Sequence, residues 1–421
     1  MPSNTSHKPY RWIPSLYVAE ALPYVAVMVM ATTLYKRMEL SNTELALYTS
    51  WLYLPWVIKP LWSPFLAALH TERWWVMAMQ LLVGAGFAGI ALTLPTAFWL
   101  QGSLAFFWLL AFASATHDIA ADGLYIIGLD TSEQSLYIGV RSTFYRIGMI
   151  LGQGALVMLA GRLEHYMAVP MAWSITFALM AACFLCLFLW HRYALPTVVP
   201  HTEGFSVRHL LSEFWLSLTT FFSKPHIVPA LLFMLLFRFP EGQLVKIANP
   251  FIIDSVDNGG LGMDTEDVGF IYGTLGVIGL LGGGLIGGYL VSRDGLSRWL
   301  WPMVLAISVP DAVYVLLSAV SSHSFLLVSS CVLIEQIGYG FGFTAYSLFL
   351  VNFSKGERST AIFSLCTAMQ ALGMMVPGMV AGYMADHLGY FRFFCWILAC
   401  CLVTFAVTAF IKVDPSFGRK Q

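Results

Sequence analysis

Twelve stretches of mostly apolar residues alternate with short polar connections along the chain. A helix needs about 20 residues to cross a bilayer at about 1.5 Å per residue. The pattern predicts spanning helices over residues 12–34, 44–68, 74–94, 104–129, 140–161, 170–192, 226–253, 266–291, 299–320, 324–351, 359–382 and 391–411. The residues of these long runs are continuously apolar and do not alternate between apolar and polar, as the strands of a transmembrane barrel do. The runs therefore indicate helices and not a barrel. The predicted fold class is an all-α membrane protein.

A polar segment separates the first six predicted spans from the last six. It divides the chain into an N-terminal six-helix half over residues 1–192, a cytoplasmic linker over residues 193–225 and a C-terminal six-helix half over residues 226–421. The connection after the second span of each half is short and carries basic residues, which is a weak internal repeat. Transporters built from parallel repeats show such a relationship between their halves.

The distribution of Lys and Arg predicts the orientation in the membrane, because cytoplasmic connections are enriched in these residues. If the N-terminus is cytoplasmic, the basic residues outside the bilayer on the far side are Lys36, Arg37, Arg162 and Arg392. Those on the cytoplasmic side are Lys8, Arg11, Arg73, Arg141, Arg192, Arg208, Lys224, Arg293, Arg298, Lys355, Arg358, Lys412, Arg419 and Lys420. This asymmetry predicts that both termini are cytoplasmic.

Composition agrees with this fold class and excludes several functions. The 421 residues are 58% hydrophobic and 11% charged, with a mean hydropathy of +0.73. No basic patch indicates a nucleic-acid partner, and no G-x-x-x-x-G-K-[ST] motif provides an ATP site. A nucleophile with its base, or a metal-binding cluster, is also not evident, so we expect no enzyme, no cofactor and no metal. The expected partners are the lipid bilayer and a small, anionic solute, and the expected state is a monomer.

The fourth predicted span carries charged residues at a depth where an unsheltered charge costs several kcal/mol. Asp118 and Asp122 are four residues apart and therefore share one helix face, with His117 beside them. We expect the two carboxylates to couple transport to protons and His117 to contact the substrate. Asp118 lies deeper in the span and is the first choice for the proton carrier, whereas Asp122 is expected to hold a basic partner, Arg141 or Arg146.

Three other predicted spans carry the remaining candidate site residues. Glu20 on the first span and Glu335 on the tenth are further candidates for proton coupling, or else partners in interhelical hydrogen bonds. On the seventh span, Arg238 and Glu241 are three apart and can pair, while nearby Pro240 and Gly242 loosen the backbone. We expect Arg238, Glu241, Gln243 and Asn249 to bind substrate, with an ion pair that only fixes helix packing as the alternative for Arg238 and Glu241.

A run of glycines lies within the eighth predicted span. Gly282, Gly284 and Gly287 fit the pattern G-x-G-x-x-G, but no strand precedes them, so a dinucleotide site is not indicated. Glycines let helix backbones approach one another in lipid. The run therefore predicts close packing of the eighth span against a neighbouring helix.

Several motifs resemble the AmpG muropeptide permease family of the major facilitator superfamily. They are residues 54–64 (LPWVIKPLWSP), 116–123 (THDIAADG), 237–241 (FRFPE), 250–254 (PFIID), 382–390 (GYMADHLGY) and Glu335 followed by Ala345, Tyr346 and Ser347. The resemblance implies that the first, fourth, seventh and tenth helices line a central cavity, and those helices carry the charged residues described above. It also implies import of an anhydro-muropeptide across the bacterial inner membrane, to which the cavity carboxylates add proton coupling. The alternatives are a permease for siderophores or other anionic nutrients, a membrane-embedded enzyme and a receptor that does not transport.

Overall fold

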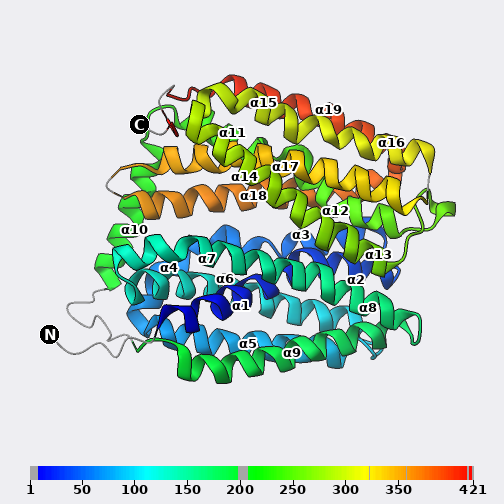
Figure 1. Ribbon diagram of the computed structural model, residues 1–421, viewed down its shortest axis with the longest axis horizontal. Coiled ribbons are helices and arrows are strands. Elements are labelled where there is room, and N and C mark those ends of the chain that lie inside the picture. Colours follow the sequence, from blue (N-terminus) through cyan, green and yellow to red (C-terminus); the bar gives the residue numbers. More distant parts are fainter. Residues whose placement is uncertain (1–7, 198–206, 322, 357, 415–416, 420–421) are drawn as a thin grey trace. The chain divides into compact units, whose positions relative to one another are not determined.

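The computed structural model describes residues 8–197, 207–321, 323–356, 358–414 and 417–419. Every regular element in these residues is a helix (Figure 1). Eleven helices of the described chain are long and apolar enough to span a membrane. The chain divides into two compact units, one formed by Met1–Ala31 with Leu61–Ser212 and the other by Thr32–Pro60 with Glu213–Gln421. The predicted division at residues 193–225 stays a prediction.

The first unit is a bundle of long helices. In it α5 packs against α6 and α9, and α1 packs against α7 (Figure 1). Its core near the start of α1 is formed by large apolar side chains that include Trp12 and Tyr17. The elements are η1 (Pro9–Arg11), α1 (Ile13–Val25), η2 (Ala26–Met30), α5 (Glu72–Thr93), α6 (Trp99–Gly128), α7 (Thr131–Met149), η3 (Ile150–Leu156), α8 (Val157–Glu164) and α9 (Val169–Ala194).

The second unit combines the C-terminal helices with a segment from early in the chain. In it α3 packs against α18 and α12, and α14 packs against α17. Its elements are α2 (Ala31–Arg37), α3 (Asn42–Trp51), α4 (Leu54–Leu69, which extends into the first unit), α10 (Val207–Phe222, which begins in the first unit), α11 (Ile227–Leu236), α12 (Phe239–Ile253), η4 (Val256–Asn258), α13 (Thr265–Phe270), η5 (Ile271–Gly276), α14 (Val277–Asp294), α15 (Leu296–Ser308), η6 (Val309–Asp311), α16 (Ala312–Val320), α17 (Phe325–Ser354), α18 (Ser359–Leu388) and α19 (Tyr390–Ala409).

The structure divides one predicted span. Residues 44–68 form two helices, α3 and α4, and neither reaches 18 residues. The division falls just before Pro55, which has no backbone N–H and whose ring clashes with the carbonyl four residues earlier. The long apolar helices of the described chain therefore number eleven, where the sequence predicts twelve.

Two further boundaries differ from the sequence prediction. The fifth predicted span starts at residue 140, but α7 already begins at Thr131, where Asp130 and Glu133 form a reciprocal capping box. The polar residues of this first part hide the helix from a hydropathy pattern. The segment 193–225, predicted as a linker, contains the helix α10.

The glycine run packs as predicted. A Cβ atom added to Gly283 on α14 would lie 2.0 Å from the carbonyl oxygen of Ile337 on α17. The contact is reciprocal, because a Cβ on Gly340 of α17 would lie 2.0 Å from the carbonyl oxygen of Leu280. Only glycine permits so close an approach of the two backbones, which confirms the role of the run in helix packing.

Candidate functional site

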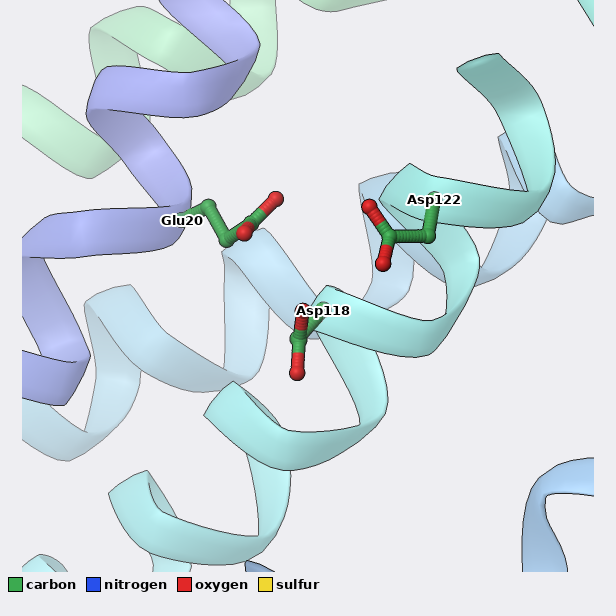
Figure 2. A group of neighbouring side chains, drawn as sticks. All are labelled: Glu20, Asp118 and Asp122. Atoms are coloured by element: carbon green, nitrogen blue, oxygen red, sulfur yellow. The ribbon is translucent and has the colours of Figure 1, made fainter. Parts of the chain in front are cut away.

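Three carboxylates meet in the first unit, where α1 packs against α6. Glu20 on α1 points toward Asp118 and Asp122 on α6 (Figure 2). One carboxylate oxygen from each residue lies within 4.8 Å of the others. The structure confirms that the spacing of four places Asp118 and Asp122 on one helix face, and it adds Glu20 to them. Such a group of oxygens suits a proton or a hard cation; its assignment to proton coupling stays a prediction.

Arg141 of α7 is the basic partner of this cluster. Its guanidinium lies 2.5 Å from the Asp122 carboxylate, so Arg141, one of the two predicted candidates, pairs with Asp122. The same guanidinium lies over the rings of Tyr17 and Tyr125, at 4.6 Å and 5.4 Å from their centroids. The aromatic faces favour the cation and hold it beside the carboxylates.

A cavity of about 280 Å³ opens beside the carboxylate cluster. Its wall combines Glu20 with two arginines and several polar side chains, so that both signs of charge face the same space. The lining residues are Tyr17, Glu20, Ile138, Arg141, Ser142, Tyr145 and Arg146. This space is large enough for several water molecules, and Glu20 forms part of its wall.

His117 lies in a chain of buried hydrogen bonds, away from an open surface. Its ring is 1% exposed, and its Nε2 lies 3.2 Å from the Gln80 amide. Gln80 also bonds His191, whose other ring nitrogen lies 2.9 Å from the Ser15 hydroxyl. This chain ties α6, α5, α9 and α1 together. The predicted contact of His117 with substrate therefore requires a different conformation and stays a prediction.

Arg238 and Glu241 form the expected pair in the second unit. The Arg238 guanidinium donates through Nε (2.8 Å) and through a second nitrogen to the Glu241 carboxylate, and it also donates to the Tyr339 hydroxyl at 2.7 Å. The pair lies at a break between α11 and α12, with Pro240 in the first turn of α12. The predicted loosening of the seventh span is thus confirmed. The charge of Arg238 is balanced by Glu241 in this conformation.

The remaining predicted residues lie in three different environments of the second unit. Glu335 on α17 accepts hydrogen bonds from Gln336 at 2.9 Å and from the Tyr314 hydroxyl at 3.4 Å. Gln243 faces α19, where it accepts a hydrogen bond from the Trp396 indole at 3.0 Å. Asn249 is 7% exposed, and its side-chain oxygen has no hydrogen-bond partner in the described chain. Of these three residues, Asn249 is the one whose side-chain oxygen can still accept a hydrogen bond from a ligand.

A further polar cluster joins α2 and α3 to the C-terminal helices; we name it the Asp254 cluster, formed by Lys36, Asn42, Asp254 and Tyr390. Lys36 lies 2.6 Å from the Asp254 carboxylate, which also accepts a hydrogen bond from the Tyr390 hydroxyl at 2.8 Å. Asn42 donates to the same hydroxyl at 3.1 Å. The cluster fixes the connection between α2 and α3 to the ends of α12 and α19.

The motif over residues 382–390 supports this connection in two more ways. A Cβ on Gly382 would lie 1.8 Å from the Asn42 carbonyl oxygen, so α18 and α3 touch through backbone. Asp386 accepts hydrogen bonds from the backbone N–H and the hydroxyl of Thr43, at 2.8 Å and 2.6 Å. The motif is therefore a docking surface for the start of α3.

Asp254 stays ionised in this environment. Partial burial disfavours its charge, but the hydrogen bonds from Lys36, Asn258 and Tyr390 outweigh that effect and hold the pKa of this carboxyl below its usual range. The stabilisation from the ion pair is therefore fully present above the ordinary pKa of Asp and is lost only as the pH falls through the lowered value.

Some residues around these groups were not predicted from the sequence. Tyr17 lies three residues before Glu20 on the same face of α1, so helical spacing was a usable signal for it. Tyr339 and Tyr390 act from helices distant in the chain, and no local pattern identifies them.

The fold and these groups define a class: a polytopic membrane protein whose ionisable side chains face one another inside helical bundles, as in carriers of ions and small solutes. Similarity to known proteins specifies the class further. The profile described as Major Facilitator Superfamily matches residues 15–376. The chain belongs to the major facilitator superfamily.

Its relatives include AmpG-like permeases. The anhydromuropeptide permease of Escherichia coli K12 is 26% identical over 349 residues, which cover 82% of this chain and 68% of the relative. The putative transporter AmpG 4 of Rickettsia conorii is 23% identical over 96% of this chain and 97% of its own length. Of the solved structures, the nucleoside transporter NupG is similar with a TM-score of 0.71 and 16% identity, covering 96% of this chain and 99% of its own. A D-xylose-proton symporter has a TM-score of 0.69 and 12% identity, over 98% and 99% of the two chains.

These similarities define what the chain does in general terms. It is an AmpG-like secondary transporter of a small molecule, embedded in a membrane by several spanning helices, and it is not an enzyme. The solved structures share its fold but are too distant in sequence to indicate its solute.

Proposed function

We propose that this chain is a proton-coupled transporter that imports a cell-wall-derived anhydro-muropeptide, or a related anionic solute, across the bacterial inner membrane. The observation that carries the coupling is the carboxylate cluster of Glu20, Asp118 and Asp122 on α1 and α6. The relative named as an anhydromuropeptide permease supports the solute.

The closeness of the three carboxylates supports a coupled proton. Glu20, Asp118 and Asp122 each bring one carboxylate oxygen to within 4.8 Å of the others. Like charges this close disfavour ionisation of all three groups at once, and a proton on one of them relieves the repulsion. We assign the proton to Asp118, because it lies deeper in the predicted span than Asp122. Glu335 is a candidate for a second protonation site in the second unit.

We assign solute binding to Arg238, the residue that precedes α12, and to the polar residues of α12 itself. Arg238 anchors a carboxylate of the solute, for which the bidentate geometry now used by Glu241 is suited. Asn249 and Gln243 provide hydrogen bonds for sugar hydroxyls, and His117 is a further candidate in the first unit. A siderophore or another anionic nutrient would use the same groups and is the alternative solute.

We further propose twelve spans, with α3 and α4 together forming the second, and cytoplasmic termini in a monomer. The asymmetry of Lys and Arg supports this orientation. Single cysteines at Asp257 and Lys355, in a chain without its native cysteines, test it with a thiol reagent that does not cross membranes. In intact cells the cysteine at position 257 should react and the cysteine at position 355 should not. The reverse pattern would show that the chain has the opposite orientation in the membrane.

Transport itself is tested with the purified full chain in proteoliposomes. Radiolabelled anhydro-muropeptide should accumulate against its gradient when the lumen is made alkaline relative to the outside, and a protonophore should abolish the accumulation. A sodium gradient should not replace the proton gradient. Accumulation that depends on sodium would contradict proton coupling, and absence of uptake, with uptake of a ferric siderophore instead, would contradict the proposed solute.

A further inference from the structure

Lys246 is a buried cation with no anionic partner in the part of the chain that the structure describes. It lies on α12 and is 1% exposed. Its ammonium donates to the Thr49 hydroxyl on α3 at 3.0 Å and lies 5.1 Å from the centroid of the Tyr53 ring. A hydroxyl and an aromatic face favour a cation but do not neutralise it. Its charge is thus left uncompensated in the interior.

Arg238 on the same transmembrane segment shows the contrast. Its guanidinium is bound by the carboxylate of Glu241 and by the hydroxyl of Tyr339. An anionic solute that binds Arg238 competes with the carboxylate of Glu241, whereas no carboxylate of the described residues competes for Lys246. Lys246 is therefore more readily available to an anion than Arg238.

Two other incompletely bonded polar groups belong to the same region of α3 and α12. Asn249 lies three residues further along α12, on the same side of the helix, and its side-chain oxygen has no partner in the described residues. The hydroxyl of Ser50, next to Thr49, is fully buried and is also without a partner there. Gly378 of α18 borders both groups, since a Cβ there would lie 2.6 Å from the Ser50 hydroxyl and 3.4 Å from Cγ of Lys246. Buried polar groups are rarely left unsatisfied unless a ligand or water completes them.

We propose that Lys246, Ser50 and Asn249 form a second anion subsite, which binds a carboxylate of the transported solute when α3 moves away from α12. The inference rests on the proposed function, because it requires an anionic solute. Lys246 exchanges the Thr49 hydroxyl for the carboxylate and so gains the counter-ion that it lacks in this conformation. Ser50 and Asn249 supply neutral hydrogen bonds, with Asn249 bonding a hydroxyl or amide of the same solute.

Binding of a matched pair of probes to the purified full chain tests the subsite. The probes are a radiolabelled anhydro-muropeptide with free peptide carboxylates and the same molecule with those carboxylates amidated. Wild-type protein should prefer the acidic probe, and Lys246→Gln should reduce this preference about tenfold, which is the usual effect of losing a charge-assisted hydrogen bond. Lys246→Arg should retain part of the preference. Lys224→Gln is the control, because the Lys224 ammonium donates to the backbone carbonyls of Phe353 and Lys355 at the C-terminal end of α17, away from Lys246 in the sequence of α12.

Three results would overturn the inference. An unchanged preference in Lys246→Gln leaves Arg238 as the anion site and refutes the subsite alone. Wild-type protein that binds neither probe refutes the proposed solute, and the inference with it. The neutral variant also removes an uncompensated buried charge, so its thermal unfolding midpoint should equal or exceed that of wild type; a clearly lower midpoint would show that the ammonium has a stabilising partner and would refute the premise.

Discussion

The contact between α14 and α17 allows a quantitative test with one methyl group. In Gly283→Ala, the new Cβ would lie 2.0 Å from the Ile337 carbonyl oxygen, where ordinary contacts begin at 3.4 Å. The two helices must therefore separate by about 1.4 Å or bend locally. Overpacking of this kind costs about 1–3 kcal/mol. Thermal unfolding of the purified protein in one detergent should show a lower midpoint, and transport should fall because the helices no longer pack in register.

Gly282 provides the matched control on the same helix. A Cβ at Gly282 meets no atom within 4 Å, so Gly282→Ala adds the same methyl group without a clash. Its only expected effect is the higher helix propensity of alanine, which leaves the midpoint unchanged or slightly raised. Equal midpoints for the two variants would refute the claim that α14 and α17 pack through their backbones at Gly283.

Two other predictions concern ion pairs of the second unit. Arg238→Ala should weaken binding of the acidic anhydro-muropeptide at least about tenfold, corresponding to about 1.5–3 kcal/mol for a charge-assisted hydrogen bond, while Arg238→Lys keeps part of it; unchanged binding by equilibrium dialysis would make the pair with Glu241 purely structural. Lys36→Gln should release the α2–α3 connection from Asp254, raising the labelling rate of a cysteine at Thr43 by an aqueous thiol reagent. Because the pKa of Asp254 is lowered, the labelling rate in protein that retains Lys36, divided by the rate for free cysteine at the same pH, should not vary across the physiological pH range, and a rise of this ratio on mild acidification would contradict the ionised pair.

Residues with local spacing signals were predictable from the sequence. The apolar runs predicted the long helices, because each run is long and apolar enough to cross a bilayer on its own. The spacing of Asp118 and Asp122 predicted that both carboxylates lie on one helix face. The same reasoning paired Arg238 with Glu241 and recognised the packing role of the glycines. The two pairings depend on residues within about one helical turn of one another, and the other two inferences depend on continuous stretches of the chain.

Contacts between distant segments were not predictable in this way. The segment Thr32–Pro60 belongs to the compact unit of the C-terminal helices, a result of tertiary contacts such as Lys36 with Asp254 and Asn42 with Tyr390. Pairwise contacts across hundreds of residues leave no periodic trace in one sequence. Hydropathy also missed the start of α7, where the polar capping residues at Asp130 and Glu133 precede the apolar part.

The central claim is that the carboxylate cluster couples solute movement to protons, and Asp118→Asn tests it most directly. In proteoliposomes this variant should lose uptake against a gradient driven by pH, because it cannot bind and release the proton. It should retain exchange of external for internal labelled anhydro-muropeptide, which needs no net proton movement. Asp257→Asn, an exposed position in η4, is the control and should keep both activities. If Asp118→Asn still concentrates the solute against its gradient, the proton does not reside on Asp118 and the account of coupling is wrong.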